Sequence, residues 1–204
     1  MATFGEVQDR IKLDYLNRSD LSAETTRAIG AAIRKYERQR FFFNESSTAV
    51  ATVAAQSHVA TQAAFFTTDY LRFFYEASAS YELTRVDMKD LLQMRGGNQA
   101  TGQPTHYAVY GERYELFPVP DSAWTVTVHG VHQLASASVD SQTTDWFSAA
   151  EDLIVYSATK LMWANVLRNR EEAAIYAELE ADAFKVLRGD TEQRMIHAIK
   201  ATRF

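Results

Sequence analysis

Apolar residues recur at three- and four-residue steps near both ends of the chain, the spacing of one face of a helix. This pattern predicts helices at about residues 4–16, 22–40, 147–169 and 171–188. Only Asn169 and Arg170 separate the last two, so we expect those two helices to pack antiparallel. Gly189 is expected to end the fourth helix, because glycine readily takes the left-handed conformation found there.

The fourth predicted helix mixes apolar and acidic positions. Its apolar residues are expected to form the packed face, and they are Ile175, Tyr176, Leu179, Ala183, Val186 and Leu187. Its acidic residues Glu178, Glu180 and Asp182 are expected on a solvated face. The pattern therefore predicts that this helix has one packed face and one solvent-exposed face.

A period of two replaces the helical spacing in the middle of the chain, at about residues 41–134. Gly111 and Glu112 form a hairpin turn between two alternating runs, and Gly130 marks a bulge in a later run. Residues 41–43 and 48–53 are read as further strands. These patterns predict an α+β fold that is mainly α. It would be an antiparallel helical bundle with a small antiparallel β-sheet or hairpin insert and an extended or helical C-terminal tail.

The last residues are set apart from the rest of the chain. We expect residues 1–189 to form one domain and residues 190–204 to form a C-terminal docking segment. Its apolar residues have little core left to enter if the two long helices already close the fold. Either the segment folds back as a third helix, or it is a peptide that orders on a partner.

Composition narrows the class of protein. The chain has 204 residues, of which 47% are hydrophobic, enough for a core. The 21 basic and 26 acidic residues give a formal charge of -5, which argues against tight binding to duplex nucleic acid. The absence of cysteine excludes disulfides and thiolate sites. No signal sequence or membrane span is apparent, so a soluble protein is expected, and a reducing cytoplasm fits it.

Candidate chemistry is sparse. His129 and His132 form an H-x-x-H pair, but residues three apart in a strand point to opposite faces unless Gly130 breaks the register. The glycine loop at Gly96, Gly97 and Gly102 lacks the G-K-[ST] ending of a phosphate-binding loop. We therefore predict no catalytic residue, no cofactor and no metal site.

Basic and aromatic residues alternate from Arg34 to Phe43. Such a run can hold a nucleic-acid backbone and stack bases. It can also be a solvated or inter-subunit basic face, which the helical spacing favours. The inter-subunit candidates are Arg34, Arg38 and Arg40.

Several segments together resemble the head–tail adaptor (connector) proteins of tailed bacteriophages. The resemblance is carried by residues 83–87, 106–111, 114–121 and 124–128, and by Asp145-Trp146 before the paired helices. The order of these elements is more specific than any single segment. It implies a virion structural protein and not an enzyme.

The resemblance also implies partners and surfaces. Such proteins form a ring, commonly twelve-fold, in the neck between the portal and the tail or nozzle proteins, with genomic DNA passing through the lumen and no membrane contact. The portal-docking candidates are Arg188, Arg194, Met195, Ile196, Ile199 and Phe204. The lumen or tail-contact candidates are Gly96, Gly97, Gly102, Gly111 and Glu112. The alternatives are a stopper or tail terminator and, from other classes, a nucleic-acid-binding module or a hydrolase.

Overall fold

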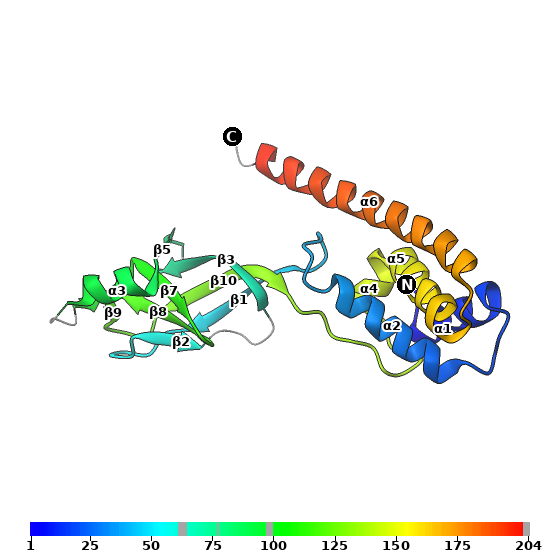
Figure 1. The fold of residues 1–204 in the computed structure, drawn as a ribbon. Coiled ribbons are helices and arrows are strands. Elements are labelled where there is room, and N and C mark those ends of the chain that lie inside the picture. Colours follow the sequence, from blue (N-terminus) through cyan, green and yellow to red (C-terminus); the bar gives the residue numbers. More distant parts are fainter. Residues whose placement is uncertain (61–64, 77, 97–99, 202–204) are drawn as a thin grey trace. The chain divides into compact units, whose positions relative to one another are not determined.

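The chain folds into two units, shown in Figure 1. The computed structural model describes residues 1–60, 65–76, 78–96 and 100–201, with side chains described as far as residue 194. Met1–Asn44 and Leu134–Phe204 make up the helical unit, and Glu45–Gln133 makes up the β unit. The β unit is thus one continuous insertion between the two segments of the helical unit.

Local sequence signals set the helix boundaries in the helical unit. At its N-terminus Thr3 and Glu6 form a capping box, in which the Glu6 N–H donates to Thr3 Oγ1 at 3.3 Å and the Thr3 N–H donates to the Glu6 carboxylate at 2.7 Å. The Asn169 side chain caps the last helix by accepting two backbone N–H groups, at 3.1 and 3.2 Å. The elements are α1 (Phe4–Asp9), the π-helical η1 (Arg10–Tyr15), α2 (Ser22–Tyr36), α4 (Asp145–Ala149), α5 (Glu151–Leu161), the π-helical η2 (Met162–Val166) and α6 (Arg170–Ala201).

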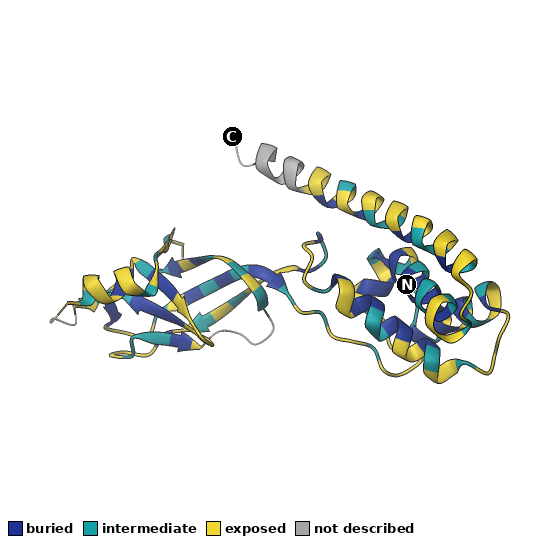
Figure 2. Cartoon of the chain, in the orientation of Figure 1, coloured by how far each residue is buried: buried dark blue, intermediate teal, exposed yellow. Residues whose placement is uncertain are grey.

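Helix α5 packs against both α2 and α6 and contributes to the core of the helical unit. Ile154, Val155 and Ala158 have no exposed surface, and Figure 2 shows this buried stripe in dark blue. Lys160 meets Glu180 on α6, whereas Leu153, earlier in α5, lies in the same groove as Leu187. The predicted antiparallel packing of the last two helices is therefore confirmed.

The described residues of the β unit form ten short strands and one helix. Two four-stranded sheets have the orders β1-β10-β3-β4 and β2-β8-β7-β5, and β6 pairs with β9. The buried side chains of the two larger sheets make a separate core that includes Leu71, Phe73, Tyr107 and Leu116. The elements are β1 (Glu45–Ala51), β2 (His58–Ala60), β3 (Phe65–Phe74), β4 (Ser80–Glu82), β5 (Thr84–Arg85), α3 (Met88–Arg95), β6 (Thr101–Gly102), β7 (His106–Tyr110), β8 (Arg113–Phe117), β9 (Val119–Pro120) and β10 (Thr125–His132).

Two local β predictions are confirmed. Strands β7 and β8 form the hairpin around Gly111, which has a φ of 59°. The register of β10 against β3 shifts between His129 and Gly130, as a bulge requires. A Cβ at Gly130 would lie 2.0 Å from the Thr67 carbonyl oxygen, so only glycine fits there.

The predicted fold class is wrong. The β region is no small insert in a helical bundle, because it forms three sheets and a core of its own. The strand predicted at residues 48–53 overlaps β1, which reads ESSTAVA, but its pairing into a sheet was not predicted. Its place in the sheet comes from pairing with β10, some 80 residues away, and local propensity does not report such pairing.

Two boundary predictions are also wrong. Phe41 to Phe43 form a turn and not a strand, because the Asn44 side chain accepts the Phe41 N–H at 2.9 Å and donates to the Gln39 carbonyl at 2.7 Å. Helix α6 continues through Gly189 to Ala201. Glycine costs only about 1 kcal/mol inside a helix, and the buried side chains of Leu187 and Thr191 hold the helix on either side of it.

Candidate functional site

A buried carboxylate on α6 holds this helix against α2 and α5. Glu180 is 4% exposed; its Oε1 accepts hydrogen bonds from Lys35 Nζ and Tyr36 Oη, both at 2.8 Å. Its Oε2 contacts Lys160 Nζ. Burial alone would raise the pKa of Glu180, but the hydrogen bonds from Lys160, Lys35 and Tyr36 outweigh it and lower the pKa to about 2. Glu180 therefore stays ionised and joins α2, α5 and α6.

Sequence reasoning placed Glu180 on a solvated face, and the structure corrects this. A signal was present, because Ala173, Glu180 and Leu187 are spaced seven residues apart and share one buried face of α6. Tyr36 stands beside the carboxylate, and burial followed by the hydrogen bond to Glu180 raises its pKa. An acidic residue at a position of an apolar repeat can thus be buried and link helices, provided that basic side chains pair with it.

The expected packed face of α6 is also partly wrong. Ile175, Leu179 and Val186 are 53%, 38% and 65% exposed, so they are not core residues. Leu179 and Val186 line a groove of about 500 Å³ against α4 and α5. Four carboxylates border this groove, from Glu151, Asp152, Asp182 and Asp190. An apolar floor with an acidic rim suits a protein partner that carries apolar and basic side chains.

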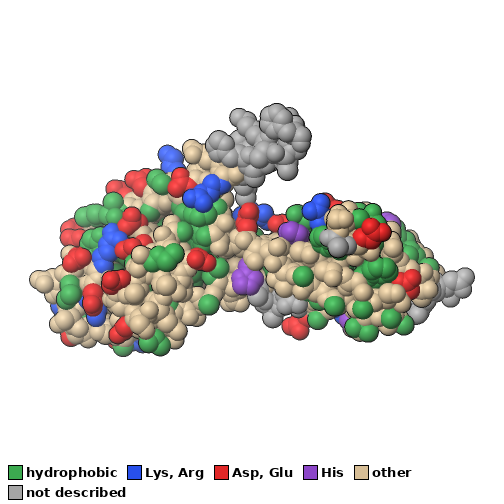
Figure 3. Space-filling view, turned by 180° about the vertical axis from the view of Figure 1, so that it is seen from behind, with side chains coloured by type: hydrophobic (Ala, Val, Ile, Leu, Met, Phe, Trp, Pro, Cys, Tyr) green, Lys and Arg blue, Asp and Glu red, His purple; other side chains and the backbone are tan. Residues whose placement is uncertain are grey.

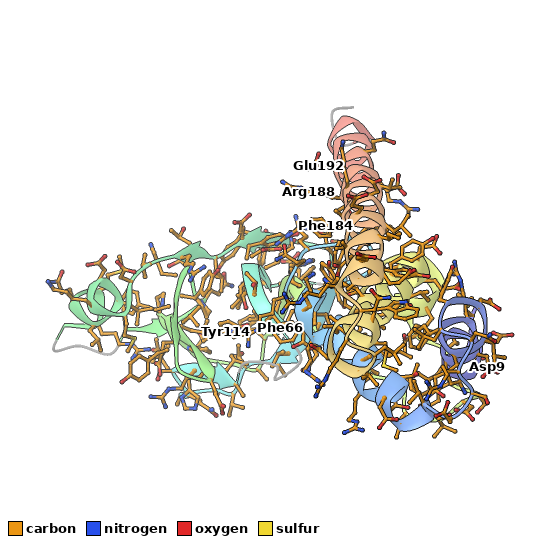
Figure 4. The ribbon with its side chains drawn as sticks, turned by 45° about the vertical axis from the view of Figure 1, so that its right-hand side comes forward. Asp9, Phe66, Tyr114, Phe184, Arg188 and Glu192 are labelled. Atoms are coloured by element: carbon orange, nitrogen blue, oxygen red, sulfur yellow. The ribbon has the colours of Figure 1, made fainter. Side chains whose placement is uncertain are left out.

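The predicted portal-docking residues lie on the C-terminal half of α6 or beyond it. Figure 4 shows Phe184, Arg188 and Glu192 following one another along the helix, and Arg188 Nε donates to Glu192 Oε1 at 3.1 Å. Arg194 lies over the ring of Phe42, 3.7 Å from its centroid. The backbone of Met195, Ile196 and Ile199 is helical, their side chains are outside the described set, and Phe204 lies outside the described residues.

The turn at residues 41–43 receives this half of α6. The Phe42 N–H donates to Thr191 Oγ1 at 3.3 Å, and Phe41 is in edge contact with Phe184 at 6.1 Å between ring centroids. Residues 190–194 therefore contact the helical unit as a continuation of α6, and not as a separate third helix that folds back.

The predicted inter-subunit arginines occupy two places. Arg34 is exposed on α2, and Arg38 is exposed in the turn that follows it. Arg40 follows α2 and lines a pocket of about 310 Å³ with Phe184 and Arg188. Tyr36 and Phe41 are 7% and 1% exposed. The partly buried Phe42 and Phe43 contact Arg194 and Trp146, so this run does not present an open row of rings for base stacking.

The predicted lumen or tail-contact residues lie at turns of the β unit. Gly96 ends α3 with a φ of 46°, Gly102 lies in β6, and Gly97 lies outside the described residues. The base of this loop is fixed because Arg95 Nη2 donates to buried Glu115 at 2.8 Å. Beside Gly111 and Glu112 at the hairpin tip, Tyr110 is 54% exposed and Arg113 lies 5.6 Å from its ring centroid.

The two histidines of the H-x-x-H pair each contact an aromatic ring. His129 stacks on Tyr70 with ring centroids 4.4 Å apart. The rings of His132 and Phe65 are in edge-to-face contact, with centroids 5.4 Å apart. Among the described residues, no group of three His, Cys, Asp or Glu side chains is placed to hold a metal. Within the same residues, no helix has the length and apolarity needed to cross a bilayer.

Comparison with known proteins places the chain in a family. The family model described as SU10 adaptor protein matches residues 2–201, so the chain belongs to that family. No curated protein matches the chain. The predicted head–tail adaptor resemblance is confirmed, and the family has a structural role in the phage particle beside other capsid or tail proteins.

Proposed function

We propose that this SU10 adaptor family member forms a ring, twelve-fold when assembled, between the portal and the tail or nozzle proteins of a phage. Genomic DNA passes through the lumen without sequence-specific binding. The formal charge of -5 suits this role, because an acidic wall repels phosphates and lets DNA slide. The chain then acts in the virion neck and is assembled in the host cytoplasm.

The observation that carries the proposal is the course of α6. The helix runs to Ala201, although its last described buried side chain is Thr191. Its final turns therefore extend past the contacts that α6 makes with Phe42. In the proposed assembly, residues 195–204 dock into the portal, and Arg188 and Arg194 flank that contact.

Deletion of residues 195–204 tests portal docking. The deletion keeps Thr191 and Arg194, so the described contacts of α6 remain. We expect the shortened chain to unfold at the same temperature as the full chain but to lose binding to the portal protein of the same phage. Unchanged portal binding would contradict the docking proposal.

The tips of the β unit are proposed to face the lumen or the tail. Gly111 and Glu112 lie at the β7–β8 turn, next to exposed Tyr110. Replacing Tyr110 with Ser should leave portal binding intact and reduce attachment of tail proteins, measured by co-sedimentation. A stopper or tail terminator would instead bind other neck or tail proteins and not the portal.

A further inference from the structure

Helix α6 carries apolar side chains on two faces, and only one face packs within the helical unit. Ala173 and Leu187 are buried against the unit. Ile175, Leu179 and Val186 form a second row on the outward side and remain exposed. Figure 3 shows hydrophobic and acidic side chains side by side on the helical unit, at the left of that view. The second row calls for a partner outside this copy of the chain.

Carboxylates run beside this exposed row at regular intervals. Glu171, Glu178 and Asp182 are all exposed, and they are separated by seven and then four residues. Steps of seven and four residues keep side chains on one helix face. The outward face of α6 therefore presents a line of three negative charges next to a line of three large apolar side chains.

Helix α2 presents the complementary pattern. Arg27 and Arg34 on α2 and Arg38 in the turn directly after it are exposed, and they are also separated by seven and then four residues. Arg27 and Arg34 lie on the side of α2 opposite its buried Ile29 and Ala32. Arg27 donates to Glu24 in its own helix at 2.7 Å, yet its side chain remains 73% exposed.

Small residues lie among these arginines. Ala23, Gly30 and Ala31 share the outward face of α2 and leave room for large side chains from another helix. The two faces thus carry opposite charges at the same spacing, and the small residues of one face leave room for the large apolar residues of the other.

The two helices also run in the same direction, which the match requires. Tyr36 on α2 meets Glu180 and Phe184 on α6, and Phe42, further along, meets Thr191. Successive copies in a ring are related by a rotation that is small when the copies are many, so α2 of one copy stays nearly parallel to α6 of the next. Both charge series have intervals of seven and then four residues, in that order along the chain. All three pairs of charges can therefore lie opposite each other only when the two helices run parallel.

We infer that α2 of one copy packs along α6 of a second copy of this chain, with Arg27 opposite Glu171, Arg34 opposite Glu178 and Arg38 opposite Asp182. The exposed Ile175 and Leu179 are then covered by the small residues of α2. The contact joins two different faces, so it continues from copy to copy and closes into a ring. This inference rests on the proposed function and names the contact that builds the ring.

Disulfide trapping tests the register. The chain has no cysteine, so Arg34→Cys with Glu178→Cys introduces one defined pair and leaves the two outer charge pairs intact. A disulfide needs Cα atoms within about 7 Å of each other. In oxidised phage particles that carry this variant, we expect a ladder of linked chains on a denaturing gel without reductant. Arg34→Cys with Lys185→Cys, about 10 Å further along exposed α6, is the matched control and should give single chains.

The outcomes separate the inference from the proposed function. Chains that are present in the particle but stay single in the Arg34→Cys/Glu178→Cys variant would overturn the inference and leave the adaptor role standing. Particles that lack the chain altogether would overturn both.

Charge reversal supplies a second measurement that does not depend on disulfide geometry. Replacing Arg27, Arg34 and Arg38 with Glu places like charges opposite each other and should lower the number of copies per particle at least about tenfold. Further replacement of Glu171, Glu178 and Asp182 with Arg should restore incorporation. All six residues are exposed, so the unfolding temperature of the isolated chain should change little. If the variant with all six substitutions keeps its fold but is still not incorporated into particles, the proposed pairing is contradicted.

Discussion

Both units bury a carboxylate among cations, but they use it differently. In the helical unit, Glu180 draws Lys35 and Lys160 from two other helices. In the β unit, Glu115 is paired with Arg95 at the end of α3 and with Arg113 on its own strand. The first cluster holds three helices together, whereas the second fixes the base of one loop. The helical unit therefore has a polar anchor that is shared by three helices, and the β unit depends on strand pairing and on the fit of its bulge.

Loss of the Glu180 carboxylate should have the largest effect. Glu180→Ala leaves Lys160, 23% exposed, and Tyr36 without their acceptor, so we expect a loss of about 3–5 kcal/mol in the free energy of unfolding of the helical unit. Denaturant unfolding followed by circular dichroism measures it. Glu178→Ala, on the exposed side of the same helix, is the control and should change stability by less than about 0.5 kcal/mol. Equal losses of stability in the two variants would show that the buried Glu180 carboxylate does not hold the helical unit together.

Acid should weaken the helical unit through the same group. The folded pKa of Glu180 is lowered to about 2, below its ordinary value of 4.5. The unfolded chain therefore takes up the proton first, and the stabilisation is complete above about pH 4.5 and is lost as the pH falls toward 2. The loss is on the order of 3 kcal/mol. Glu180→Gln should flatten this part of the stability–pH curve, and an unchanged slope would contradict the assignment.

The bulge should be the corresponding weak point of the β unit. Gly130→Ala brings a Cβ to 2.0 Å from a backbone oxygen, so we expect a loss of about 2–3 kcal/mol, measured by thermal unfolding. Gly189→Ala is the matched control in the helical unit, because nothing lies within 4 Å of the added atom. It should stabilise α6 by about 0.5–1 kcal/mol. Stabilisation by both substitutions would show that the bulge does not constrain the β unit.

The contact between Arg194 and Phe42 should have the smallest effect. Arg194→Ala removes a cation from above the ring, at a cost of about 0.5–1 kcal/mol. Faster hydrogen exchange at the amides of residues 190–194 would report the loosened end of α6. Gln193→Ala, exposed one residue earlier, should leave these rates unchanged.

The sequence predicted the parts of the fold that local spacing determines. The starts of the first, second and fourth helices, the Gly111 hairpin and the Gly130 bulge each depend on neighbouring residues and are confirmed. The third predicted helix, at residues 147–169, is wrong at its start, because the chain forms α4 from Asp145 and α5 from Glu151. The strand at residues 48–53 was predicted, but its pairing with β10 was not, because that pairing joins segments far apart in the chain. Gly189 was misread as a helix end because side chains packed on both sides of it outweigh its propensity.

The candidate site was predictable only in outline. Arg34 and Arg38 were identified as exposed basic positions, and their exposure agrees with that reading. Glu180 was missed because its partners Lys35 and Lys160 come from distant helices. The exposed row on α6 was assigned to the core because one sequence cannot show which of two apolar faces of a helix meets its own fold and which meets another chain.

Electron cryomicroscopy of the neck of the phage particle tests the central claim most directly. The adaptor account predicts a ring of copies of this chain in contact with the portal, with the end of α6 directed into the portal and DNA in the lumen. A reconstructed neck in which no density fits the helical unit would contradict it.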